Sequence, residues 1–208
     1  MIIRRGIYSQ YQEQGKDALH FDSTYQDKVN LPYSFYTGVR TLSTKFKPDN
    51  TTNASYPTEQ LLGQYLGGAS YPNRTVLFRF LNGIFAVYLN IGNNYTYLYS
   101  NAGVYFNAGQ WYDATITLGS AGGARLYING VLQSTHPYTG ALQGSADAFW
   151  GGWYVGDSFN GTQKELRAWT IERTPSEVVA DMTRVYTGAE TGLKAYFPTN
   201  EGSGNTIQ

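Results

Sequence analysis

The stretch WYDATITLGSAGGARLYINGVLQS, residues 111–134, contains the pattern that decides the fold. Its first eight residues alternate, with Tyr112, Ala114, Ile116 and Leu118 opposed to Trp111, Asp113, Thr115 and Thr117. Alternation with period two is the mark of a β-strand that buries one face. A glycine-rich loop at 119–123 lets the chain reverse, and Asn129-Gly130 suits the positive φ angles of a two-residue hairpin. The stretch therefore predicts consecutive antiparallel strands.

The same period recurs on both sides of this stretch. In FAVYLNI, residues 85–91, one face carries Phe85, Val87, Leu89 and Ile91, and the other carries Ala86, Tyr88 and Asn90. Upstream, the segments 18–22, 28–32 and 41–48 have the composition of strands and are separated by prolines and polar loops. Short strands joined by Gly and Asn turns are typical of an antiparallel β-sandwich or jelly roll, so we predict an all-β fold.

One helix interrupts this pattern late in the chain. Thr174-Pro175-Ser176-Glu177 has the form of a capping box with proline at the first helical position. The spacing predicts a short helix over 175–184, with Gly188 as its terminator. Because KELRAWTI, residues 164–171, alternates as a strand just before the cap, the helix is expected to connect two strands.

The composition limits the classes of function. The composition is uniform along the 208 residues, which predicts a single domain spanning 1–208. Fifteen basic and fifteen acidic residues balance, and no basic stripe forms, so nucleic acid is not an expected partner. No apolar run is long enough to insert into a membrane, and the first residues lack the apolar core of a secretory signal peptide. The absence of cysteine excludes thiol catalysis and thiolate zinc sites.

Four segments, in order along the chain, resemble laminin-G-like domains of the concanavalin A-like lectin/glucanase superfamily. The residues that carry the resemblance are Leu19, Phe21, Asp22, Asp27 and Val29; Trp111, Leu126, Tyr127, Asn129 and Gly130; Gly156, Phe159, Asn160, Gly161, Glu165, Arg167 and Trp169; and Glu201, Gly202, Gly204 and Asn205. Ser23 departs from the pattern, because the family usually has glycine there. The resemblance covers about residues 16–208 and implies two packed antiparallel sheets, one of them curved. Since an Asp usually follows the last motif, we expect this domain to be part of a longer polypeptide.

Catalysis is not expected from these residues. The resemblance implies that a glucanase of this superfamily would carry Glu-x-Asp-x-x-Glu on one strand, and no glutamate of this chain begins that pattern. His20 and His136 are the only imidazoles, and neither lies in a recognisable nucleophile motif. We therefore expect a protein that is not an enzyme. A carboxylate pair formed between distant segments is the alternative that leaves a glycoside hydrolase open.

The segment FWGGWYVGDSFN, residues 149–160, is the candidate for carbohydrate contact. Sugar recognition needs aromatic faces for stacking and short polar side chains for hydroxyl groups. Strand parity places Trp150 opposite the core-facing side, so a sugar-facing rim of Trp150, Tyr154, Asp157 and Asn160 is the functional hypothesis. The alternatives are ordinary core and turn roles, with a bulge at Gly151-Gly152 that would change the parity.

Calcium is the candidate metal, because the chain offers oxygen ligands. Asp22 and Asp27 bracket one predicted turn and Asp157 lies in the loop 156–161. The alternative is that these carboxylates only shape turns. No cofactor is required.

Together these features predict a non-catalytic binding module that recognises a glycan or a host surface receptor. The 19 tyrosines and the Gly, Asn and Thr content suit an extracellular surface or a virion appendage, such as a phage tail fibre or another adhesin. The alternative is a structural decoration or spacer domain that contacts neighbouring subunits of an assembly.

Overall fold

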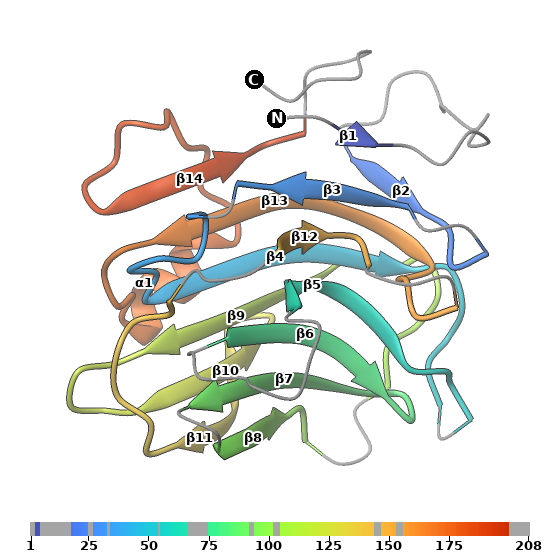
Figure 1. Ribbon diagram of the computed structural model, residues 1–208, viewed down its shortest axis with the longest axis horizontal. Coiled ribbons are helices and arrows are strands. Elements are labelled where there is room, and N and C mark those ends of the chain that lie inside the picture. The colour runs from blue at the N-terminus through green and yellow to red at the C-terminus, as the bar shows by residue number, and fades with distance from the viewer. Residues whose placement is uncertain are drawn as a thin grey trace.

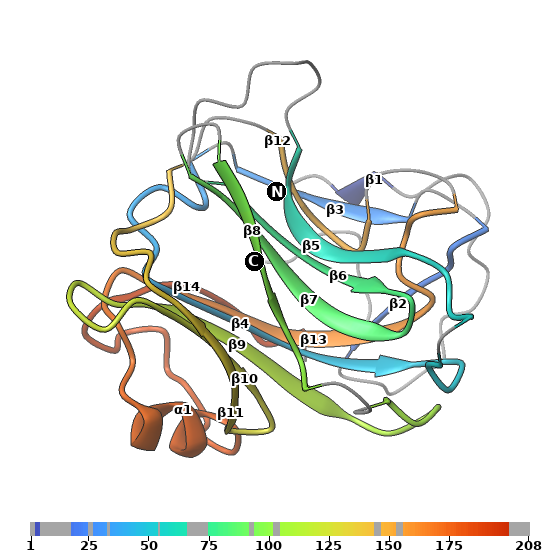
Figure 2. The same cartoon turned by 90° about the horizontal axis from the view of Figure 1, so that it is seen from below.

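The computed structural model describes residues 3–4, 18–24, 27–32, 34–53, 55–65, 75–91, 94–101, 105–143, 147–152 and 156–199. Two antiparallel sheets lie face to face as a sandwich (Figure 1). Figure 2 shows the two layers from the side, with the helix α1 outside one of them. The all-β prediction is confirmed.

We call the two layers sheet A and sheet B. Sheet A has the order β1 (Ile3–Arg4), β3 (Lys28–Leu31), β12 (Asp147–Trp150), β5 (Glu59–Tyr65), β6 (Thr75–Leu81), β7 (Ile84–Ile91) and β8 (Asn94–Tyr99). Sheet B has the order β11 (Val131–His136), β10 (Ala124–Ile128), β9 (Tyr112–Leu118), β4 (Thr41–Pro48), β13 (Gly161–Trp169) and β14 (Leu193–Phe197), and β2 (Leu19–Phe21) pairs with β13. Strands that follow one another in sequence often lie in different sheets, so residues from distant segments meet in each layer.

The hairpin predicted at Asn129-Gly130 is present. β10 and β11 pair with Ile128 opposite Val131, and the two turn residues have φ angles of 50° and 74°. A two-residue turn with both central φ angles positive matches the right-handed twist of the strands that it joins. This local chemistry sets the register at one edge of sheet B.

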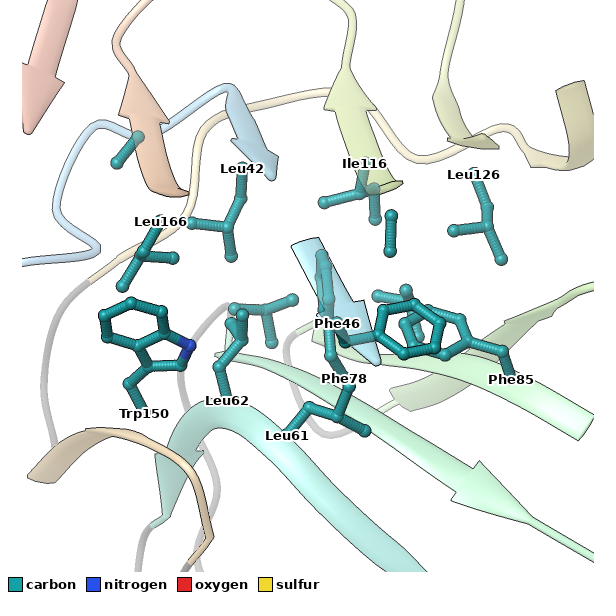
Figure 3. Packing of buried hydrophobic residues seen from close by; sticks show 14 of the residues in the cluster. Leu42, Phe46, Leu61, Leu62, Phe78, Phe85, Ile116, Leu126, Trp150 and Leu166 are labelled. Carbon is teal, nitrogen blue, oxygen red and sulfur yellow. The ribbon is translucent and has the colours of Figure 1, made fainter. Parts of the chain in front are cut away.

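Aromatic side chains fill the space between the sheets. Alternation in β7 turns Phe85, Val87 and Leu89 inward, where each is at most 1% exposed. The ring of Phe46, from β4, lies at the centre of the cluster (Figure 3). Its ring centroid is within 6.2 Å of those of Phe80, Phe85, Phe106, Tyr112 and Phe159. Contacts between aromatic rings contribute beyond their buried area, so this cluster holds the two sheets together.

Helix α1 (Pro175–Asp181) begins at the predicted capping box. The Glu177 N–H donates to Thr174 Oγ1 at 3.3 Å, and the Thr174 N–H donates to Glu177 Oε2 at 2.8 Å. The helix ends earlier than the predicted residue 184, with Met182 as its C-cap, so Gly188 does not terminate it. The physical reason is that the backbone tightens to i→i−3 bonds after Asp181, since the Met182 N–H donates to the Val179 carbonyl and the Thr183 N–H to the Ala180 carbonyl, both at 3.3 Å.

Buried charges attach α1 to the outer face of sheet B. The Arg167 side chain, fully buried in β13, donates to the Asp181 backbone carbonyl and pairs with Asp113 Oδ2 of β9 at 2.7 Å. Arg173 lies over the Trp169 ring, 4.3 Å from its centroid. Burial raises the pKa of the Asp113 carboxyl even though Arg167 acts to lower it. Desolvation therefore dominates at this pair.

Candidate functional site

The structure corrects the expected exposure of Trp150. Its side chain is 0% exposed and lies in the core near Leu62 and Leu166 (Figure 3). The indole Nε1–H donates to Gln163 Oε1 at 2.8 Å, so its polar atom is satisfied internally. A sugar cannot stack on this ring. The parity argument fails because Gly151, with φ 113°, bends the chain directly after β12, where a Cβ would collide with the Phe21 ring.

The rest of the predicted sugar rim is only partly described. Asp157 and Asn160 are half-buried at one end of the sandwich, and Tyr154 lies outside the described residues. The Asp157 carbonyl accepts from the Gln60 N–H at 2.6 Å, and its carboxylate lies 3.5 Å from Gln60 Nε2. The Asn160 N–H donates to Glu59 Oε2 at 3.2 Å. These contacts tie the 157–160 loop to the start of β5.

The residues predicted to bind calcium shape two adjacent turns. The Thr24 N–H donates to Asp22 Oδ1 at 2.8 Å, and the Asp22 N–H donates to Asp27 Oδ2 at 3.3 Å. The Gly156 N–H donates to the Ser23 carbonyl at 3.0 Å, which places the loop of Asp157 beside this turn. Over the described ranges, no three acidic or histidine side chains form a group that could hold a metal ion. Calcium takes six to eight oxygen ligands, so a site here would depend on carbonyl groups and water.

Glu59 is a buried carboxyl that the sequence analysis does not single out. It lies at the head of β5, is 2% exposed, and its Oε2 also accepts from the Tyr56 hydroxyl at 2.9 Å. Burial raises the pKa of Glu59 to about 7, although the bonds from Asn160 and Tyr56 oppose that rise. The nearby Asp49 carboxylate adds to it, and Asp49 itself pairs with His20 at 2.8 Å. In the sequence, Glu59 is marked only by its place at the start of the segment Glu-Gln-Leu-Leu, residues 59–62.

Four tyrosines, two exposed and two half-buried, form an aromatic surface on the outer face of sheet A. We call Tyr88, Tyr95, Tyr97 and Tyr99 the tyrosine face. Tyr88 of β7 pairs with Tyr97 of β8, and their ring centroids are 5.3 Å apart. Tyr95 and Tyr99 extend the surface along β8. The ring centroid of Tyr95 lies 5.9 Å from that of Tyr88, and the ring centroid of Tyr99 lies 5.5 Å from that of Tyr97. Tyr95 is 70% exposed and Tyr99 is 44% exposed. Since the alternate residues of both strands face the core, these rings point away from it.

Polar groups continue this surface across the neighbouring strands. The register places Gln60 of β5, Arg79 of β6, Ala86 of β7 and Tyr99 of β8 in one row. Within the part of the chain that the structure describes, Arg79 Nε and Gln60 Oε1 are buried without a hydrogen-bond partner. Each such group costs about 1–3 kcal/mol as long as it has no partner. Figure 2 shows that the strands of this sheet are curved along their length.

In the described segments, no helix has the length and apolar character needed to cross a bilayer.

Solved structures with the same fold include several lectin-like modules. Domain 4 of the arabinanase AbnA from Geobacillus stearothermophilus, in complex with arabinotriose, is 22% identical, with a TM-score of 0.56 over 80% of this chain and 76% of that one. The CBM40 domain of the Ruminococcus gnavus IT-sialidase, bound to α2,3 sialyllactose, is 16% identical, with a TM-score of 0.56 over 80% and 96%. A pentraxin from Limulus polyphemus is 17% identical, with a TM-score of 0.54 over 77% and 78%.

No curated protein matches the chain, whereas one family model does. The family model for the concanavalin A-like lectin/glucanases superfamily matches residues 22–179, which is most of the sequence. The chain therefore belongs to the concanavalin A-like lectin/glucanases superfamily.

Proposed function

We propose that this protein is a non-catalytic module that binds carbohydrate through the tyrosine face of sheet A. The observation that carries the proposal is the exposure of a tyrosine row on a rigid sheet, with Tyr95 at 70%. Tyrosine rings offer flat apolar surfaces to the C–H face of a sugar, while their hydroxyl groups remain available for bonding. The fold supports this use, because two similar domains carry arabinotriose and sialyllactose.

A cationic side chain on the same face of sheet A favours a ligand rich in hydroxyl groups. The half-buried Arg79, on the strand next to β7, would donate from its guanidinium group to a sugar oxygen. We expect weak binding at one such site. Display in several copies would raise the avidity about a hundredfold or more. An extracellular surface or a virion appendage, such as an adhesin or a fibre, is the setting we propose for that display.

Substitution of Tyr95 by Ala should weaken glycan binding about tenfold, because one stacked ring contributes up to about 1.5 kcal/mol. Binding is measured on a glycan array that includes arabinotriose and α2,3 sialyllactose, followed by titration calorimetry with the best ligand. Tyr95→Phe should retain most of the affinity, since it keeps the ring. Tyr105→Ala is the matched control, because Tyr105 is 45% exposed but lies outside sheet A.

Three results would contradict this proposal. One is a ligand whose affinity is unchanged by both Tyr95→Ala and Tyr99→Ala. Another is the appearance of shorter sugars when the protein is incubated with a bound oligosaccharide, since that would make it a hydrolase. Absence of binding across the array at millimolar concentrations would also count against carbohydrate as the ligand.

An apolar surface favours protein contact as a second function. Val131 and Leu132 of the β10–β11 hairpin are 62% and 46% exposed, and Val179 of α1 is 51% exposed. The hairpin turn lies against the helix, since a Cβ on Gly130 would be 2.9 Å from Val179 Cγ2. Exposed aliphatic side chains gathered from two elements are typical of interfaces.

If this surface joins subunits, Val131→Ser with Leu132→Ser should lower the mass measured by light scattering at high protein concentration. Glycan binding at the tyrosine face should be unchanged in that variant. A wild-type protein that is monomeric throughout, with the same mass as the variant, would contradict a role in self-assembly.

A further inference from the structure

Two lysine ammonium groups converge on one indole ring on the outer face of sheet B. Lys164 Nζ lies 4.6 Å from the ring centroid of Trp111, and Lys47 Nζ lies 5.4 Å from it. The two positive charges are therefore at most about 10 Å apart, so they repel each other most at low salt, where screening is weak. All three side chains are half-buried, so their outer atoms reach solvent.

The sheet register explains how the three side chains meet. Phe46 of β4 faces the core and pairs with Tyr112 of β9, so Lys47 and Trp111 follow on the outer face. Lys47 pairs with Thr162 of β13, two residues from Lys164 on the same face. Strands β4 and β13 and the residue just before β9 thus contribute to the group, which we call the Trp111 site (Trp111, Lys47 and Lys164).

Helix α1 leaves this part of the sheet uncovered. The helix is attached at the other end of β4, where Thr41 Oγ1 donates to the Ile171 carbonyl and accepts from the Arg173 N–H. Lys47 lies at the far end of the same strand, six residues away. Figure 2 shows α1 beneath one end of sheet B only. The Trp111 site is therefore on the open half of that face.

Lys47 and Lys164 differ from the nearby cationic side chains Lys45 and His20, which each form an ion pair. Lys45 pairs with Glu165 at 2.7 Å, and His20 pairs with Asp49 at 2.8 Å. Within the described residues, no carboxylate pairs with Lys47 or Lys164. The cation–π contacts hold both ammonium groups in place without neutralising them. In a chain with no net charge, this pair is a local excess of positive charge.

We propose that the Trp111 site binds the sulfate or carboxylate group of an acidic glycan. Two ammonium groups held against one indole ring provide positive charge for an anionic group, which would reduce their mutual repulsion on binding. No stripe of Lys and Arg extends along the sequence from this pair, which disfavours the phosphate backbone of a nucleic acid. A sugar polymer instead spaces its charges between hydroxyl groups. This site lies on the opposite sheet from the tyrosine face and does not depend on it.

The probe is a chondroitin sulfate tetrasaccharide, with desulfated chondroitin tetrasaccharide and neutral maltotetraose for comparison. Binding by calorimetry at about 20 mM salt should follow the charge of the sugar and weaken at about 150 mM salt. Lys47→Gln and Lys164→Gln should each weaken binding about fivefold, and the double variant more than tenfold. The desulfated sugar separates the contribution of sulfate from that of carboxylate.

Arg184→Gln is the matched control, because Arg184 also lies over an aromatic ring, 5.3 Å from the centroid of Tyr186, at the other end of the fold. It removes the same net charge and should leave binding unchanged. An equal loss in this control would mean that the sugar responds to net charge only, and the proposal would be wrong. Equal binding of a four-nucleotide DNA strand, with the same lysine dependence, would replace the glycan assignment. No binding at low salt would overturn the site, and the Tyr95→Ala variant should bind this probe normally.

Discussion

Replacing Asp113 by Leu is expected to lower the free energy of unfolding by about 3–5 kcal/mol, and the melting temperature by about 10 °C. The reason is that Arg167 is fully buried and would lose its only carboxylate partner among the described residues. Equilibrium unfolding in urea, followed by circular dichroism, measures the change. The double variant Asp113→Leu with Arg167→Met should lose less than the single one, because no charge then stays buried.

Glu172→Gln provides the matched control for this prediction. Glu172 pairs with Arg125 at 2.8 Å, nearly the same separation, but its side chain is 30% exposed. The loss there should be below about 1 kcal/mol, since water solvates the remaining charge. Equal effects at the two pairs would contradict the prediction and would mean that Arg167 reaches solvent when its partner is removed.

The sequence predicts the parts of this fold that depend on neighbouring residues. The hairpin at Asn129-Gly130 and the capping box at Thr174 follow from local backbone chemistry, and both are present. Alternation within β7 likewise orients Phe85 inward and Tyr88 outward. Such features need no knowledge of which strands pair. They account for the strands around 85–91 and 111–134 and for the start of the helix.

The candidate site depends on strand pairing, which the sequence does not show. Tyr88 faces outward by its own parity, but its place beside Tyr97 follows from the β7–β8 register. Trp150 shows the opposite failure, because parity carried across Gly151 places a core residue at the surface. The convergence of Lys47 and Lys164 on Trp111 also needs three strands in register. Long-range pairing therefore separates what alternation can predict from what it cannot.

Replacing Glu59 by Gln is expected to remove a pH dependence from the stability of the protein. Burial raises the pKa of Glu59 to about 7, so the folded state keeps this carboxyl protonated at pH values where the unfolded chain ionises it. The stabilisation is complete below the unfolded pKa, falls as the pH rises, and is lost above about 7. By linkage the whole change amounts to about 3 kcal/mol.

Urea unfolding of wild type and Glu59→Gln, measured between about pH 5 and pH 8, tests this expectation. The amide can still accept from Tyr56 and Asn160, so the variant should gain stability relative to wild type as the pH rises. Glu190→Gln is the control of opposite sign. Backbone N–H groups of Thr187 and Gly188 donate to the exposed Glu190 carboxylate and lower its pKa, so its contribution is lost as the pH falls. Parallel curves for wild type and Glu59→Gln would show that Glu59 titrates alike in both states, and that water reaches the head of β5.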